Sequence, residues 1–298
     1  MLAAMFTGAY TAIVTPFTKT GQVDEKRLRE LVEFQLANGI DGLVPCGTTG
    51  ESPTLSHEEH NQVIELTVKF VAQRCPVIAG TGSNCTDEAI ALTQHAKAAG
   101  VAATLQVVPY YNKPTQAGLY AHFRAIAEAV DLPMIVYNIP GRCGVDLAND
   151  TLARLRKDLP KQVVGLKEAT GNVDRVSQTR SLVDDGFDVL SGDDSLTLPM
   201  MSVGARGVIS VASNVAPREV SDMVHAASKG DFATAGKLHA RLLPLFKDLF
   251  IETNPVPVKA ALAMAGKIEE TYRLPLVPMG AANRKQLQQT LAQLGLVK

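Results

Sequence analysis

The chain has 298 residues, 46% of them hydrophobic, and a formal net charge of −1 at pH 7. This length suits one large domain with an extension, and so weak a charge argues against a basic surface for nucleic acids or anionic membranes. Trp is absent and aromatic residues make up only 5%, so nucleic-acid bases would find few rings to stack on. We therefore expect neither a nucleic-acid partner nor a membrane partner.

Cysteine usage and the N-terminal residues bear on the cellular compartment. None of the four cysteines belongs to a Cys-x-x-Cys pair, which argues against zinc and dithiol sites and suits a reducing cytosol. Residues 1–8 lack the basic and apolar regions of a signal peptide, and no apolar run approaches the roughly 18 residues of a spanning helix. The sequence predicts a cytoplasmic protein.

Short apolar segments alternate with helical patterns along most of the chain. The predicted strands cover residues 10–17, 42–46, 76–80, 102–108, 133–137, 163–167, 187–191 and 207–211. Because they are continuously apolar rather than alternating, we expect helices to cover their outer faces. After residue 217 the pattern changes to consecutive helices, predicted at 220–228, 233–250, 257–265 and 284–294.

Helix signals fill the gaps between the predicted strands. Asp24 begins the first helix, which ends at residues 38–39. Ser56 and Glu59 form a capping box for the second. A third begins at residue 86 or 87 and ends at Gly100.

Eight strands alternating with helices are typical of an α/β protein with a closed (β/α)8 TIM barrel. The alternative is an open doubly wound sheet, which usually carries a Gly-rich phosphate turn after its first strand. The chain has no G-x-G-x-x-G sequence, so the barrel is favoured. We predict a catalytic barrel over residues 1–220 and a C-terminal helical domain over 221–298, packed on the barrel because no low-complexity linker separates them.

Active sites of such barrels lie at the carboxyl ends of the strands, and Lys167 ends the sixth one. Burial lowers the pKa of a lysine and frees a neutral amine for attack on a carbonyl, so Lys167 is a candidate Schiff-base nucleophile. The alternative is a lysine whose stem runs out of the strand end into solvent.

Other strand ends carry polar groups with plausible roles. Gly47-Thr48-Thr49-Gly50 places hydroxyl and N–H groups on a turn that can hold a carboxylate, or it is an ordinary loop. Tyr137 can pass a proton, or it simply lines the barrel. Arg142 can grip a carboxylate, or it forms a surface ion pair. His57 and His60 share a helix face but have no third ligand nearby, so no metal site is expected.

Together the amine, phenol, hydroxyls and guanidinium suit a 2-oxo acid. The amine forms an imine with the ketone, the turn holds the carboxylate, and the phenol moves protons. The imine is an electron sink, so the methyl carbon can become an enamine nucleophile. The guanidinium would then hold a second substrate that also carries a carboxylate.

The sequence resembles the pyruvate-dependent Schiff-base lyase and aldolase superfamily, and within it the dihydrodipicolinate synthases rather than the N-acetylneuraminate lyases. The resemblance runs nearly end to end. It is carried by Gly-Thr-Thr-Gly-Glu (47–51), Ala-Gly-Thr-Gly (79–82), Pro-Tyr-Tyr-Asn-Lys-Pro-Thr-Gln (109–116), Tyr-Asn-Ile-Pro-Gly-Arg (137–142), Gly-Leu-Lys-Glu-Ala-Thr-Gly (165–171) and Ser-Gly-Asp-Asp (191–194).

The resemblance implies an activity: condensation of pyruvate with L-aspartate 4-semialdehyde to 4-hydroxy-tetrahydrodipicolinate, in diaminopimelate and lysine biosynthesis, with no cofactor beyond the imine on Lys167. Tyr137, Thr48 and Tyr111 would relay protons, Tyr111 from a neighbouring subunit of a homotetramer built from two tight dimers. Thr49, Gly192 and the backbone of Ile209 would bind pyruvate, and Arg142 would bind the semialdehyde. Cys143 stands where these synthases often have Thr.

A second group resembles the allosteric lysine site of bacterial and plant synthases and implies feedback inhibition. Its members are Ser52, His57, His60, Asn84, Glu88 and Tyr110, with Pro53 at an alanine-like position. The alternative is a helix surface with dimer contacts only. Two other functions stay open: another aldolase of the superfamily that splits a sugar acid or a 4-hydroxy-2-oxo acid, and a barrel that only binds a small acid as a sensor.

Overall fold

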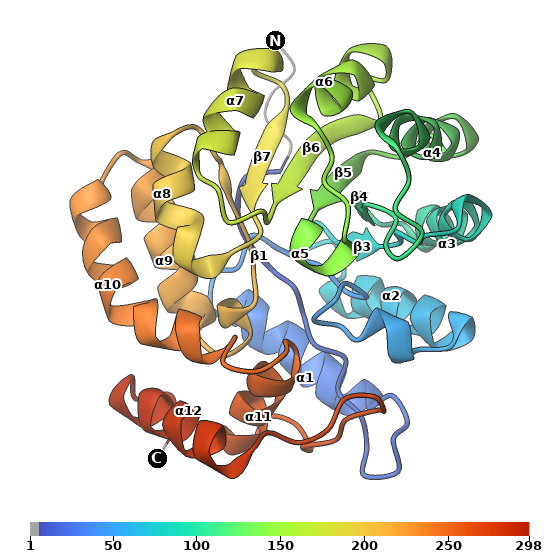
Figure 1. Cartoon of the computed structure of the whole chain (residues 1–298). Coiled ribbons are helices and arrows are strands. Elements are labelled where there is room, and N and C mark those ends of the chain that lie inside the picture. The colour runs from blue at the N-terminus through green and yellow to red at the C-terminus, as the bar shows by residue number, and fades with distance from the viewer. Residues whose placement is uncertain (1–5, 298) are drawn as a thin grey trace.

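The computed structural model describes residues 6–297, and a barrel of eight parallel strands lies at its centre (Figure 1). The strand order is β2-β1-β8-β7-β6-β5-β4-β3. The strands are β1 Gly8–Thr11, β2 Gly42–Leu43, β3 Ile78–Gly80, β4 Ala103–Val107, β5 Met134–Asn138, β6 Val163–Glu168, β7 Asp188–Ser191 and β8 Gly207–Ser210. A parallel bridge between Leu43 and Val77 joins the two ends of this order. The predicted TIM barrel is therefore confirmed.

The first two strands are shorter than predicted. Regular pairing of the first strand ends at Thr11, and Phe17 makes only an isolated antiparallel bridge with Val23. Beyond the strand, the Val14 N–H donates to the side chain of Asn214 (3.2 Å) rather than to a neighbouring strand. Pro45 has no N–H and cannot extend the ladder of β2.

Twelve helices surround and extend the barrel of the described chain. They are α1 Glu25–Ala37, α2 His57–Val71, α3 Thr86–Ala99, α4 Gln116–Ala129, α5 Pro140–Cys143, α6 Asn149–Asp158, α7 Asp174–Leu182, α8 Thr197–Ser202, α9 Pro217–Ser228, α10 Phe232–Asp248, α11 Val256–Met264 and α12 Ala281–Gln293. The predicted caps are confirmed: Asp24 caps α1, Ser56 and Glu59 form the capping box of α2, and Gly100 ends α3 in a left-handed conformation.

Alternation along β6 decides which side chains enter the barrel. Val164 belongs to a cluster with Tyr10, Leu105 and Ile209 that fills the interior. Leu166, two residues on, instead belongs to the outer cluster under the helices, because β6 has one extra residue where it pairs with residues 134–135 of β5. Lys167 follows Leu166 and so faces inward.

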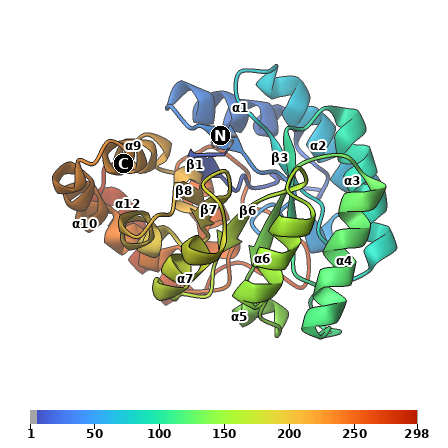
Figure 2. The same ribbon diagram turned by 90° about the horizontal axis from the view of Figure 1, so that it is seen from above.

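The last three helices are joined through α12, which packs on both α10 and α11 (Figure 1). Helix α10 also packs on α9, beside which it lies in Figure 2. On the α1 side, the Lys267 ammonium lies 3.5 Å from the centroid of the Phe34 ring. The extension therefore packs on the barrel, as the sequence predicts.

The boundary between the barrel and the helical extension does not lie where the sequence pattern puts it. The predicted division at residues 220–221 falls within α9, a continuous helix that packs against β1. We propose that the barrel unit includes α9 and that the helical extension begins with α10.

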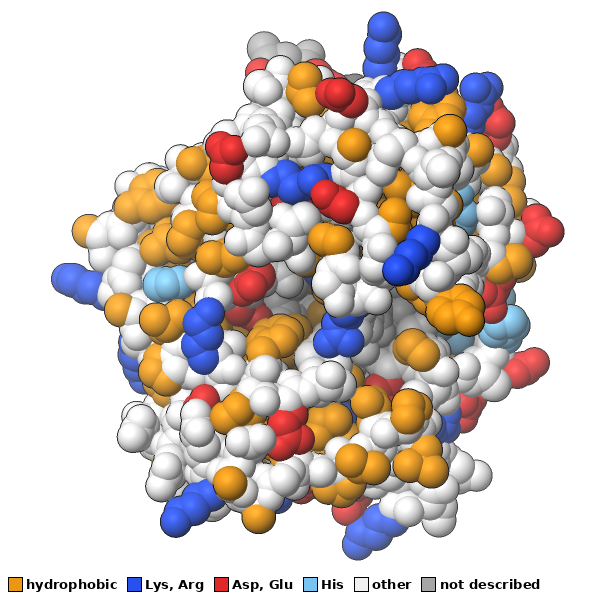
Figure 3. Space-filling view, viewed as in Figure 1, with side chains coloured by type: hydrophobic (Ala, Val, Ile, Leu, Met, Phe, Trp, Pro, Cys, Tyr) orange, Lys and Arg blue, Asp and Glu red, His pale blue; other side chains and the backbone are white. Residues whose placement is uncertain are grey.

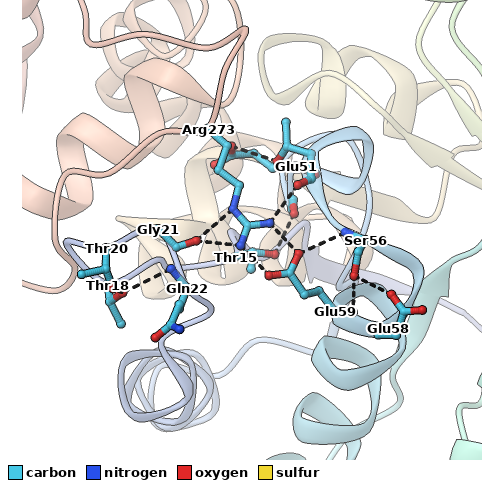
Figure 4. Close-up of polar contacts among 12 residues, drawn as sticks. Thr15, Thr18, Thr20, Gly21, Gln22, Glu51, Ser56, Glu58, Glu59 and Arg273 are labelled. Carbon is cyan, nitrogen blue, oxygen red and sulfur yellow. Dashed lines mark hydrogen bonds and ion pairs between the residues drawn. The ribbon is translucent and has the colours of Figure 1, made fainter.

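Two basic side chains of the extension reach into the loop that follows β2. Lys259 of α11 is fully buried and forms an ion pair with the equally buried Glu51. Arg273 makes a two-pronged ion pair with Glu59 (2.6 Å for both contacts) and donates to the Gly21 carbonyl (Figure 4). The extension is thereby tied to the turn on which Thr48 and Thr49 lie.

None of the helices between residues 6 and 297 combines the length and apolar character that crossing a membrane requires. The prediction about a signal peptide concerns residues 1–8, most of which lie outside the described residues.

The Lys259–Glu51 pair gives a stability prediction. Replacing Lys259 by Met leaves a buried carboxylate without its partner, and we expect the free energy of unfolding to fall by about 3–5 kcal/mol in denaturant titrations. The double variant Glu51→Gln/Lys259→Met should recover much of that loss, since it buries no charge.

Lys285→Met is the matched control, because Lys285 is an exposed lysine of the same extension. Its effect should stay within about 0.5 kcal/mol. Wild-type stability in Lys259→Met would show that the pair does not hold the extension to the barrel.

Candidate active site

Lys167 lies inside the barrel, at the carboxyl end of β6. Its Cα is paired in register with that of Tyr137 on β5, so the two side chains are direct neighbours. The lysine is 6% exposed, and its Nζ lies 4.2 Å from the centroid of the Tyr137 ring. The alternative of a lysine stem running out into solvent is therefore wrong.

Burial changes the acid–base behaviour of this amine. Desolvation lowers the pKa of Lys167 to about 7, helped by the positive charge of Arg142 and opposed by the carboxylate of Asp194. A large fraction of the amine is then unprotonated at neutral pH, whereas an ordinary lysine with a pKa near 10.4 would be almost wholly charged. An amine in this state can act as a nucleophile toward a carbonyl.

Asp194 is the acidic group that acts on Lys167. It is buried in the short helix Asp194–Leu196 after β7 and accepts hydrogen bonds from the Ser210 hydroxyl (2.5 Å) and from the N–H groups of Val211 and Ala212 (3.0 Å each). These bonds fix the loop after β7 to the end of β8. Burial raises the pKa of Asp194, and the three hydrogen bonds oppose that change.

Gly192 is required beside the lysine for steric reasons. Its N–H donates to the Glu168 carbonyl (2.7 Å), and a Cβ at this position would lie 2.7 Å from Cβ of Ala169 and 3.2 Å from Cε of Lys167. Any side chain here would displace the lysine stem or the strand end.

Tyr137 is the phenol of the predicted proton relay. It is buried, and burial raises its pKa, while the charge of Arg142 and a hydrogen bond with Thr48 act in the opposite direction. The phenol therefore stays protonated and can donate, with Thr48 as its neighbour for proton exchange. The structure thus brings Lys167, Tyr137 and Thr48 together.

The two hydroxyl groups of the Thr48-Thr49 turn have different surroundings. Thr48 is half-buried and lines a pocket with Tyr137 and Arg142. Thr49 is 3% exposed, and its Oγ accepts a hydrogen bond from Nδ2 of Asn254 (3.0 Å). Ile209, predicted to bind pyruvate, lies in the interior cluster at the end of β8.

Arg142 lies on α5 at the exposed rim of this pocket. Its Nη2 donates to the backbone carbonyl of Asn254 (3.2 Å). The neighbouring Cys143 is buried, which raises the pKa of its thiol to about 11 and leaves it uncharged. The same face of the molecule is hollowed near its centre, beside a basic side chain (Figure 3).

Tyr111 is not part of this group within one chain. It is 89% exposed and has a φ of 71°, in the left-handed region that bulky residues rarely adopt. The loop around it is nevertheless ordered, since Asn112 donates to the carbonyl of Asn84 (2.8 Å).

The predicted effector residues are only partly brought together. Nε2 of His57 contacts Oε1 of Glu88 (2.7 Å), and Asn84 donates to the Tyr110 carbonyl (3.2 Å). Ser52, Pro53 and Tyr110 line the same pocket as Thr48. His60 differs: it is 4% exposed and its Nε2 contacts the Gly80 carbonyl (2.9 Å), although its charge still lowers the pKa of Glu88.

Sequence reasoning missed two functional candidates. Asn254 lies far along the chain from the turn it contacts, and the helical pattern around it carries no sign of that contact. Asp194 stands in a recognised motif, but its effect on Lys167 depends on a fold that brings two neighbouring strand ends together. Among the described residues, no group of three or more His, Cys, Asp and Glu side chains could hold a metal ion.

Comparison with known proteins agrees with this geometry. Residues 5–294 match the model of the dihydrodipicolinate synthetase family. The chain is 56% identical over 292 residues to a 4-hydroxy-tetrahydrodipicolinate synthase of Nitratidesulfovibrio vulgaris, covering 98% of this chain and 99% of the relative.

Solved structures give the same result. A dihydrodipicolinate synthase from Acinetobacter baumannii complexed with pyruvate is 47% identical, with a TM-score of 0.96 and coverage of 98% of this chain and 100% of that one. The synthase from Cyanidioschyzon merolae with lysine bound is 43% identical, with a TM-score of 0.95 and coverage of 98% and 99%. The match in sequence and fold over nearly the whole length shows that this chain belongs to the dihydrodipicolinate synthetase family.

Proposed function

We propose that the chain condenses pyruvate with L-aspartate 4-semialdehyde to give 4-hydroxy-tetrahydrodipicolinate. One observation carries the proposal: the buried amine of Lys167, with its pKa lowered to about 7, lies 4.2 Å from the ring of Tyr137. The relatives named as synthases at more than 50% identity support the synthase over another aldolase.

The chemistry begins with the free amine of Lys167. It attacks the ketone carbon of pyruvate, and the carbonyl oxygen leaves as water after receiving protons from Tyr137 and Thr48. The resulting imine withdraws electrons, so a methyl proton is lost and an enamine forms. Because the imine formed on Lys167 is the electron sink, the proposed reaction needs no separate cofactor.

The enamine carbon then attacks the aldehyde carbon of the second substrate and forms the new C–C bond. The amino group of that substrate attacks the imine carbon, which closes the ring and displaces Lys167 as a free amine. One water is released overall. Tyr137, protonated because of its burial, is placed to donate to the oxygen that becomes the 4-hydroxyl.

Two carboxylate-binding groups would orient the substrates. Thr49 and the backbone at Ile209 suit pyruvate, since both residues are buried and Ile209 belongs to the interior cluster that also contains Tyr137. Arg142, at the rim, suits the carboxylate of the semialdehyde through its planar fork. Arg142 is also the feature that favours a semialdehyde over the uncharged end of a sugar.

We infer that Tyr111 completes the proton relay of a neighbouring copy of the chain. An exposed aromatic ring on an ordered loop in a left-handed conformation is costly for an isolated chain and suits insertion into a partner. This supports the proposed homotetramer of tight dimers.

The four free cysteines support the proposed cytoplasmic location.

The contacts around Glu88 support a proposal of feedback inhibition by L-lysine. Glu88 is the group suited to the lysine ammonium: hydrogen bonds from Ser83 and His57 lower its pKa and keep it charged. Tyr110, half-exposed, would cover the aliphatic stem. A relative with lysine bound has the same fold.

The first prediction concerns the covalent intermediate. Borohydride with pyruvate should add one pyruvate-derived group to the peptide containing Lys167, as read by mass spectrometry, and Lys167→Ala should abolish it.

The Arg142→Ala variant tests the binding of the second substrate. It should keep the pyruvate adduct, but its kcat/KM with aspartate semialdehyde should fall by at least about 100-fold, as for removal of a bidentate charged contact. The proposal would be contradicted if Lys167→Ala kept the adduct and Arg142→Ala kept its kcat/KM. Absence of turnover by the wild-type chain would also contradict it.

The second prediction concerns pH. Because only the neutral amine attacks, the rate of adduct formation with pyruvate should rise about tenfold per pH unit below 7 and level off above it. Asp194 raises the pKa of Lys167, so Asp194→Asn should move the midpoint to lower pH.

Asp231→Asn removes a carboxylate at the start of α10 and serves as the control for a general charge effect. Its midpoint should match the wild type. A rate that keeps rising to pH 10 in the wild type would mean that Lys167 titrates as an ordinary lysine.

The third prediction tests the effector site. Added L-lysine should inhibit the wild-type chain, and Glu88→Gln should require about tenfold more lysine for the same fractional inhibition, since a charged contact is lost. Glu65→Gln is the matched control, because Glu65 makes the other His–Glu contact between α2 and α3, with His95 (2.8 Å). Equal lysine sensitivity of the two variants would argue against an effector site at Glu88.

A further inference from the structure

We propose that Asn254 of the C-terminal extension sets the direction of the Thr49 hydroxyl, so that its hydrogen is offered to the carboxylate of the bound 2-oxo acid. Asn254 is then a positioning residue for the pyruvate site. This inference rests on the proposed function, in which Thr49 binds that carboxylate.

The contact is direct and buried. Asn254 lies in the segment between α10 and α11 and is 4% exposed, and Thr49 is 3% exposed. The Asn254 Nδ2 donates to the Thr49 Oγ at 3.0 Å, across 205 residues of sequence.

The chemistry of the two groups fixes the direction of the bond. An amide nitrogen can donate but cannot accept, so the Thr49 oxygen is the acceptor. The hydroxyl hydrogen of Thr49 has no acceptor among residues 6–297 and must point elsewhere. A carboxylate has only acceptor atoms, so a hydroxyl whose hydrogen is kept free for it is the complementary group.

The rest of Asn254 fits a functional role better than a purely structural one. Its Oδ1 is buried and has no hydrogen-bond partner among the described residues. Burying an unpartnered carbonyl is destabilising, and the single hydrogen bond from Asn254 to Thr49 offsets that cost only in part.

Asn254 also connects the two proposed carboxylate-binding groups, Thr49 and Arg142. Its backbone carbonyl accepts the hydrogen bond from Arg142, the proposed ligand of the second carboxylate. One residue of the extension therefore contacts both Thr49 and Arg142, the two groups proposed to orient the substrates.

The test compares Asn254→Ala with Asn254→Asp in borohydride trapping at varied pyruvate concentration. The alanine variant should need about three- to tenfold more pyruvate for half-maximal trapping, the effect of one neutral hydrogen bond. The aspartate variant should be worse than alanine, by at least about another threefold, because its carboxylate captures the Thr49 hydrogen and repels the anion.

A merely structural role predicts the reverse order, because Asp has nearly the shape of Asn and alanine leaves a cavity. Wild-type pyruvate dependence in Asn254→Asp would mean that Thr49 donates to residue 254 and would overturn the proposal. Asn283→Asp is the matched control: Asn283 lies in the same extension and donates to Glu252 (2.7 Å), and its pyruvate dependence should be unchanged.

A second measurement needs no buried charge and decides the question if the aspartate variant does not fold. In a Thr49→Val background, Asn254→Ala should cause no further loss of pyruvate affinity, whereas additive losses would overturn the proposal. Failure of the wild-type chain to trap pyruvate would instead contradict the proposed function, so the two failures are distinguishable.

Discussion

The burial of one amino group is the constraint on which the site depends. An ammonium is costly to move out of water, and the structure responds by lowering the pKa of Lys167 to about 7 rather than by neutralising it with a close ion pair. Asp194 moderates that change, and its own three hydrogen bonds hold it where it cannot approach the lysine freely. Gly192 leaves the space that the lysine stem occupies.

The helical extension has a second role besides covering the barrel. Lys259 pairs with Glu51 in the loop after β2, and Asn254 contacts the Thr48-Thr49 turn of that loop. Arg273 donates to the Thr54 carbonyl of the loop and pairs with Glu59 of α2. These contacts join residues more than 200 positions apart, so the carboxylate-binding turn is held by two parts of the chain. A loop held in this way can present a hydroxyl with a fixed direction, which a mobile loop cannot.

The sequence predicts the barrel, the helix caps and the inward lysine well, because each depends on local patterns: apolar runs, Ser56 with Glu59, and the end of β6. It fails where an outcome depends on distant contacts. The early end of β1 follows from a bond between Val14 and Asn214, and α9 continues through residue 220 because it packs on β1. The contact of Asn254 with Thr49 and the effect of Asp194 on Lys167 also depend on distant parts of the chain, and no local sequence pattern indicates either of them.

The central claim is that about half of the Lys167 amine is neutral at pH 7 before any substrate binds. Its most direct test is an NMR titration of the chain with 13C-labelled lysine, in which Lys167→Ala assigns the Cε signal. The account predicts a titration midpoint close to 7 for that signal. A midpoint above 9 would show an ordinary, charged lysine and would contradict the account.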